Sequence, residues 1–140
     1  MSQPISSQFL RFCIVGTLGF IVDAGSLYLI MAWWKWGPYS SRLLSFLIAA
    51  TATWGLNRTY TFEAASGDSI HYEWLKYLGY ASIGGTINYA TYVVCLLTSD
   101  MARLYPIIGV AAGSITGLAF NFTASRHFVF GTAKAKQGVD

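Results

Sequence analysis

The residues best suited to chemistry are two arginines, each of which ends a long apolar segment. Arg58 stands in Asn57-Arg58-Thr59-Tyr60-Thr61-Phe62, and Arg126 stands 68 residues further on, in Ser125-Arg126-His127-Phe128-Val129-Phe130. A guanidinium group presents a planar fork of donors that matches the oxygens of a phosphate. Two such groups at the same edge of two apolar segments indicate a site for an anionic headgroup at a membrane surface. The alternative is that both arginines are ordinary basic anchors that reach toward any anionic lipid.

Two further basic residues are predicted to lie at the same edge. Arg11 and Lys76 each stand at the start of another apolar segment. Together with the two arginines they would form a ring able to hold a lipid phosphate. The aromatic side chains near this ring, which could contact a headgroup or serve only as interfacial anchors, are Trp54, Tyr60 and Phe122.

The apolar segments themselves predict transmembrane helices. Of the 140 residues 54% are hydrophobic and 11% are charged, whereas soluble domains carry about 25% charged residues. Runs 77–99 and 104–125 contain no Asp, Glu, Lys or Arg, and run 12–34 contains only Asp23. A spanning helix needs about 20 such residues, and run 43–57 reaches that length if residues 39–41 join it and Arg42 snorkels. We therefore predict an all-α membrane protein with four transmembrane helices.

The two halves of the chain match each other. An offset of 65 aligns Phe9-Leu10-Arg11-Phe12 with Trp74-Leu75-Lys76-Tyr77, and an offset of 68 aligns Arg58 with Arg126. We predict one domain, residues 1–140, built from two tandem helical-hairpin repeats at about 9–62 and 74–130, with a flexible tail at 131–140. Because each half holds two spans, the repeats run parallel. The excess of basic residues at one edge predicts that both termini are cytoplasmic.

Polar residues inside the spans mark a candidate path through the bilayer. The predicted path residues are Asp23, Thr53, Asn57, Asn88 and Asn121. A carboxylate at the depth of Asp23 costs roughly 2.5–3.5 kcal/mol on insertion scales, so Asp23 is a functional candidate. The alternative is a neutral Asp23 hydrogen-bonded to Asn88 or to a helix backbone. The small residues that accompany these positions are also typical of ordinary helix packing.

Soluble-enzyme chemistry is not predicted. His71 and His127 are isolated, and the sequence contains no metal-ligand cluster, phosphate-cradling glycine loop or nucleophile elbow. We therefore expect no catalytic residues, no cofactor and no metal site. The net charge of +3 follows from the orientation in the membrane, so it does not indicate a nucleic-acid partner.

In combination these motifs resemble the GtrA-like family of small four-helix membrane proteins. The resemblance rests on Phe9-Leu10-Arg11-Phe12, Val15-Gly16, Asp23 and the two arginine endings, and it covers residues 9–130. The chain departs from the pattern at Ser125, which stands where the first ending has Asn57.

The resemblance implies a multi-pass protein of the bacterial inner (plasma) membrane. Its implied function is to flip a polyprenyl-phosphate-linked sugar, such as undecaprenyl-phosphate-glucose, to the periplasmic leaflet for cell-surface polysaccharide such as O-antigen. The implied partner is a polyprenyl-phosphate glycosyltransferase. Four helices enclose little space, so we also expect a homodimer or larger assembly. Two other functions stay open: a non-transporting anchor or recruitment subunit for that glycosyltransferase, and a proton-coupled small multidrug-type transporter.

Overall fold

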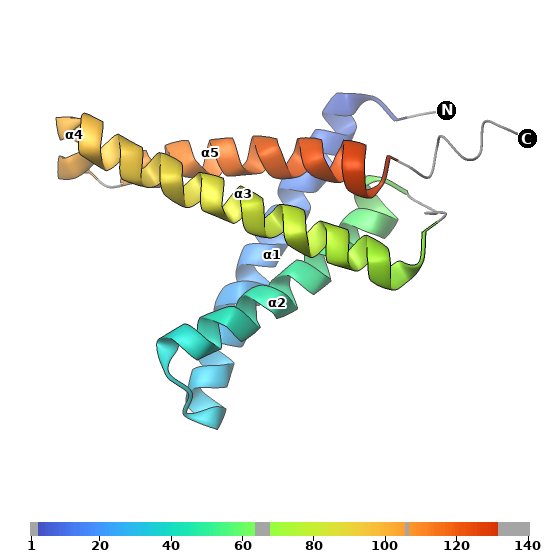
Figure 1. Cartoon of the computed structure of the whole chain (residues 1–140), viewed down its shortest axis with the longest axis horizontal. Coiled ribbons are helices and arrows are strands. Elements are labelled where there is room, and N and C mark those ends of the chain that lie inside the picture. The colour runs from blue at the N-terminus through green and yellow to red at the C-terminus, as the bar shows by residue number, and fades with distance from the viewer. Residues whose placement is uncertain (1–2, 64–67, 106, 132–140) are drawn as a thin grey trace, which may run out of the picture.

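The described part of the chain consists of helices arranged as two hairpins (Figure 1). The computed structural model describes residues 3–63, 68–105 and 107–131. The first hairpin is formed by α1 (Ile5–Trp34) and α2 (Pro38–Leu56). The second is formed by α3 (Ile70–Thr98) and α5 (Ile107–Ala124), with the short α4 (Asp100–Leu104) at its tip. No strand occurs within these residues, and the predicted all-α class is confirmed.

Local backbone chemistry sets the helix boundaries. Lys35 adopts the left-handed conformation, with φ of 55°, and this ends α1. Pro38 opens α2, where its fixed φ suits the first helical position and its missing N–H is not needed. Ser69 caps α3 by accepting a hydrogen bond from the backbone N–H of Tyr72 at 3.4 Å.

Both hairpins end in a π-helical turn that carries one of the two arginines. The turn η1 (Asn57–Thr61) continues α2, and η2 (Ser125–Val129) continues α5. The backbone N–H of Phe62 donates to the carbonyl of Asn57, and that of Phe130 donates to Ser125, both at 2.9 Å. Such i→i+5 turns are rare and are frequent at functional sites.

Within each hairpin the helices approach closely at a glycine. A Cβ atom at Gly19 would clash with the side chain of Thr53 on α2, and one at Gly84 would clash with Asn121 on α5. Only glycine allows two helix backbones to come this near, and small residues serve the same purpose in membrane helix pairs generally. The two close approaches occupy matching positions of the two halves.

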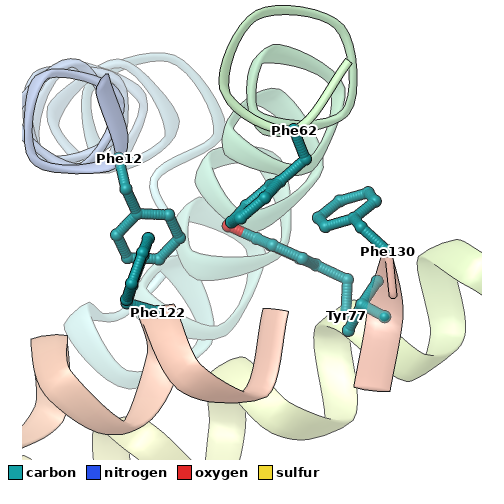
Figure 2. Close-up of a cluster of buried hydrophobic side chains, with 6 residues drawn as sticks. Phe12, Phe62, Tyr77, Phe122 and Phe130 are labelled. Atoms are coloured by element: carbon teal, nitrogen blue, oxygen red, sulfur yellow. The ribbon is translucent and has the colours of Figure 1, made fainter. Parts of the chain in front are cut away.

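The hairpins meet at a cluster of buried side chains, which we call the aromatic cluster (Figure 2). Its members are Phe12, Phe62, Tyr77, Phe122, Val129 and Phe130. The rings of Phe62 and Phe130 stack with centroids 4.9 Å apart, which joins the ends of the two hairpins. The hairpins cross near this end and diverge toward α4 and the α1–α2 turn (Figure 1).

The outward faces of the helices are apolar. Phe20 and Trp33 on α1 are 71% and 78% exposed. Among the described helices, α1 meets the length and hydropathy expected of a membrane span, and little of it is buried by the rest of the chain. Large apolar surfaces of this kind mark contact with lipid or with a partner. The predicted tail, 131–140, lies outside the described residues except for Gly131.

Candidate functional site

A cavity of about 670 Å³ lies between the two hairpins. Along α1 its lining runs from Phe12 to Asp23, which is about 16 Å of helix at 1.5 Å per residue. This is about half of the ~30 Å hydrocarbon core of a bilayer. All five predicted path residues line this one cavity: Asp23, Thr53, Asn57, Asn88 and Asn121.

Asp23 is hydrogen-bonded to a side chain of the neighbouring helix, α2. The hydroxyl of Ser45, a fully buried residue of α2, donates to Oδ1 of Asp23 at 2.7 Å. This hydrogen bond crosses the α1–α2 contact, whereas the alternative considered from the sequence placed Asn88 or a helix backbone beside Asp23. The carboxylate is thus oriented by α2 at the wall of the cavity.

The two asparagines nearest the crossing of the hairpins differ in their contacts. Asn57 is buried, donates through Nδ2 to the hydroxyl of Tyr77 at 3.0 Å and accepts from Thr61 at 2.8 Å. Oδ1 of Asn121 is buried too, but it has no hydrogen-bond partner among the described residues. Asn57 therefore helps to join η1 to α3, while the amide of Asn121 is available to bind a polar guest in the cavity.

The four basic residues predicted to bind phosphate all lie at the end where the hairpins meet, in the first turns of α1 and α3 and in the two π turns. Three of them form ion pairs with carboxylates, at N···O distances of 3.0, 2.9 and 3.0 Å: Arg11 with Glu63, Arg58 with Glu73, and Lys76 with Asp68. Three of the four basic residues are therefore already paired with carboxylates, and the four do not form an open ring of free cations.

The sequence analysis did not single out Glu73, which lies at the end where the hairpins meet. Glu73 is 0% exposed, and its Oε1 accepts from Nε of Arg58 at 2.9 Å and from Nε1 of Trp54 at 3.0 Å. A buried carboxylate is costly unless it is paired and hydrogen-bonded, so these contacts fasten the end of the first hairpin to α3. The available signal was an acidic residue directly before the aromatic-basic start of an apolar segment.

The aromatic candidates also separate into two kinds. Tyr60 is 50% exposed, and the guanidinium of Arg11 lies 5.0 Å from its ring centre. Phe122 belongs to the aromatic cluster, and the indole of Trp54 is bonded to Glu73. Tyr60 is thus the most exposed of the three.

Arg126 differs from the other three basic residues. No ion pair joins it to another residue of the described ranges. It lines a second, smaller pocket together with Gln8 and Phe130.

These features define a class: an all-helical membrane protein with apolar outer faces, basic residues gathered at one end, and a cavity between two hairpins that is lined in part by polar side chains. The family model of the GtrA/DPMS transmembrane domain matches residues 11–137. The chain therefore belongs to the GtrA/DPMS transmembrane domain family, and the resemblance found in the sequence is confirmed. Membership suggests a role in processes that involve polyprenyl-phosphate sugars. A search of curated proteins found no match.

Proposed function

We propose that this protein carries a polyprenyl-phosphate-linked sugar, such as undecaprenyl-phosphate-glucose, between the leaflets of the bacterial inner membrane. The observation that supports this most strongly is the cavity of about 670 Å³ between the hairpins, whose largely apolar lining carries several hydroxyl and amide side chains. Hydroxyl and amide groups there offer a sugar hydrogen bonds in place of water, whose loss would otherwise be costly. The apolar outer faces leave the polyprenyl chain in contact with lipid.

In this proposal α1, α2, α3 and α5 all span the membrane, and both termini are cytoplasmic. The two long helices have 30 and 29 residues, and the two shorter ones have 19 and 18 and are each continued by a five-residue π turn. At 1.5 Å per residue each of these lengths reaches about the 30 Å of a hydrocarbon core. The basic end then faces the cytoplasm, and the matching π turns and glycine contacts support two parallel repeats.

The transfer would make and break no covalent bond, so we propose that the protein is not an enzyme. A polyprenyl-phosphate glycosyltransferase would supply the loaded lipid at the cytoplasmic side, where the phosphate meets the basic end. The cavity takes up about half of the membrane thickness. We propose that a second copy of the chain, or movement of the diverging hairpins, completes the path on the other side.

Cavity-filling substitutions test this function. Gly85 lines the cavity and Gly79 does not, while a Cβ atom at either position has no atom within 4 Å. In proteoliposomes that contain the lipid-linked sugar, we expect Gly85→Phe to slow leaflet transfer by about tenfold or more, since ~1.4 kcal/mol added to the barrier suffices. The matched variant Gly79→Phe should retain transfer, measured with a sugar-oxidising reagent that reaches the outer leaflet only.

Equal transfer by both variants and by empty liposomes would reject transport. If the glycosyltransferase also left the membrane in cells without this protein, the recruitment role would take its place. Proton-dependent binding of a lipophilic cation that is lost in Asp23→Asn would instead favour the multidrug-type function.

A further inference from the structure

Each π turn brings its arginine to the first turns of the helix that leads the other hairpin. In η1, Nε of Arg58 donates to Oε1 of Glu73 at 2.9 Å, and Glu73 lies in the first turn of α3. At the offset of 65 residues, the counterpart of Glu73 near the start of α1 is Gln8. At the offset of 68, the counterpart of Arg58 is Arg126. The two halves therefore present one arginine-glutamate pair and one arginine-glutamine pair.

The second pair borders a pocket, which we call the Arg126 pocket. Arg126 and Gln8 line it together with Phe62, Phe130 and Gly131, and its volume is about 340 Å³. Ligand sites typically have volumes of about 300–1,000 Å³. Gln8 is only 6% exposed, yet its Oε1 has no hydrogen-bond partner in the described part of the chain. Because buried polar groups are normally hydrogen-bonded, this acceptor points to a ligand in the pocket that can donate to it, such as one with a hydroxyl or a protonated phosphate oxygen.

The charge of Arg126 is not balanced by the carboxylates that the structure describes. Four of these pair with other basic residues: Glu63, Asp68, Glu73 and Asp100. Asp23 lines the larger cavity, where it accepts from Ser45. A part-buried guanidinium with unused donors favours an oxyanion, since charge-assisted hydrogen bonds are among the strongest available.

We propose that the Arg126 pocket binds the oxygens of a phosphate group, which would pair with Arg126 as the carboxylate of Glu73 pairs with Arg58. Glutamine is suited to this position because Nε2 of its amide can donate to an ionised phosphate oxygen, while Oε1 can accept from an O–H of the ligand. A glutamate there would satisfy Arg126 internally and repel the phosphate. Gln8 is thus the counterpart of Glu73 in the symmetry of the two halves. The site at Arg58 is filled by the carboxylate of Glu73, whereas the site at Arg126 is open to a ligand.

The aromatic cluster lines both the Arg126 pocket and the larger cavity. It contributes Phe62 and Phe130 to the walls of the pocket, and Phe12 and Tyr77 to the walls of the cavity. The ring centre of Phe62 lies 6.2 Å from that of Phe12, and the ring centre of Phe130 lies 6.2 Å from that of Tyr77, so contacting aromatic rings join the wall of the pocket to the wall of the cavity. The phosphate site itself rests on Arg126 and Gln8. Only the statement that the phosphate belongs to a lipid rests on the proposed function.

The test uses the full chain in nanodiscs of phosphatidylcholine, with two separate probes: polyprenyl phosphate in the disc and inorganic phosphate in solution. Native mass spectrometry counts bound lipid, and a thermal-shift titration gives the affinity for each probe. We expect Gln8→Glu and Arg126→Gln each to weaken binding by about tenfold or more, the loss expected for a charge-assisted hydrogen bond. The reciprocal variant, Glu73→Gln, should keep the first site and raise the number of bound phosphate groups from one to two.

Binding of polyprenyl phosphate alone would identify a lipid headgroup as the ligand, and binding of inorganic phosphate alone would identify a free phosphate. The proposal is overturned if the wild-type chain binds neither probe, or if Gln8→Glu and Arg126→Gln both bind as the wild type does. If the chain binds polyprenyl phosphate through Arg126 but transfers no lipid-linked sugar, the phosphate site is supported and the proposed transport function is rejected. Transfer of the lipid-linked sugar without binding at Arg126 would retain the proposed function and reject the site.

Discussion

Arg58 and Arg126 have the same sequence context, but their surroundings give them different roles. Arg58 is bonded to Glu73, which is fully buried and also accepts from Trp54. A phosphate at Arg58 would have to displace this carboxylate and leave it buried and unpaired, which is strongly unfavourable. We therefore assign Arg58 to the junction between the hairpins and Arg126 to the ligand.

This assignment predicts a large loss of stability in Arg58→Ala. Removing one partner of a buried ion pair costs about 3–5 kcal/mol, and partial exposure of Arg58 places the expected loss near the lower figure. The double variant Arg58→Ala/Glu73→Ala should recover part of it, because no buried charge is then left alone. Thermal unfolding in detergent measures both changes.

The matched control is Arg103→Ala. Arg103 pairs with Asp100 at 3.1 Å, but the two side chains are 57% and 91% exposed. Exposed pairs contribute about 0–1 kcal/mol, so this variant should unfold almost as the wild type does. Equal losses in the Arg58 and Arg103 variants would show that the Arg58–Glu73 pair does not fasten the hairpins.

At the scale of the helices, both hairpins depend on close approach at glycines. Gly84 on α3 lies against Asn121 of α5, and Gly19 on α1 lies against Thr53 of α2. Both neighbours also line the cavity. The packing of each hairpin therefore fixes where the polar walls of the cavity stand.

We predict that Gly84→Ala destabilises the second hairpin, whereas Gly79→Ala on the same helix does not. The added methyl group at Gly84 would clash with the side chain of Asn121, and at Gly79 it meets no atom within 4 Å. Overpacking typically costs about 1–3 kcal/mol, while alanine at an open helical position gains up to about 1 kcal/mol over glycine. Unfolding temperatures of the two variants should thus move in opposite directions, and shifts of the same sign would contradict the close approach.

At the scale of the whole molecule, the crossing of the hairpins gathers all the predicted phosphate-binding residues at one end and leaves the hairpin tips apart (Figure 1). An apolar outer surface, together with polar side chains in a cavity between the hairpins, distinguishes the molecule from a soluble domain. This arrangement suits a membrane protein whose ligand has a charged head and an apolar tail.

The orientation proposed here predicts which residues a membrane-impermeant thiol reagent reaches. In a background with Cys13→Ser and Cys95→Ser, Ile70→Cys should label only from the cytoplasmic side, and Met101→Cys only from the periplasmic side. Both side chains are exposed, at 52% and 57%, and they lie at opposite ends of the second hairpin. Labelling of both from one side of intact cells would rule out the four-span topology.

The sequence by itself determined the all-α class, the membrane character, the family and several of the polar residues that line the cavity. Long runs without charge exclude a soluble surface, and helical spacing places Asp23, Asn88 and their companions on inward faces. These properties follow from local composition and periodicity, which a single segment carries within itself. The family match over residues 11–137 rests on the same local patterns.

Only the tertiary structure decided which of the basic residues form ion pairs with described carboxylates and which one faces a pocket instead. The partners Arg58 and Glu73 are 15 residues apart, and Gln8 and Arg126 come from opposite ends of the chain, so no local pattern links either pair. Their meeting depends on the crossing of the two hairpins at the aromatic cluster and on the π turns that aim the arginines. Charge pairing is set by distance through space, and for residues far apart in sequence that distance exists only in the folded chain.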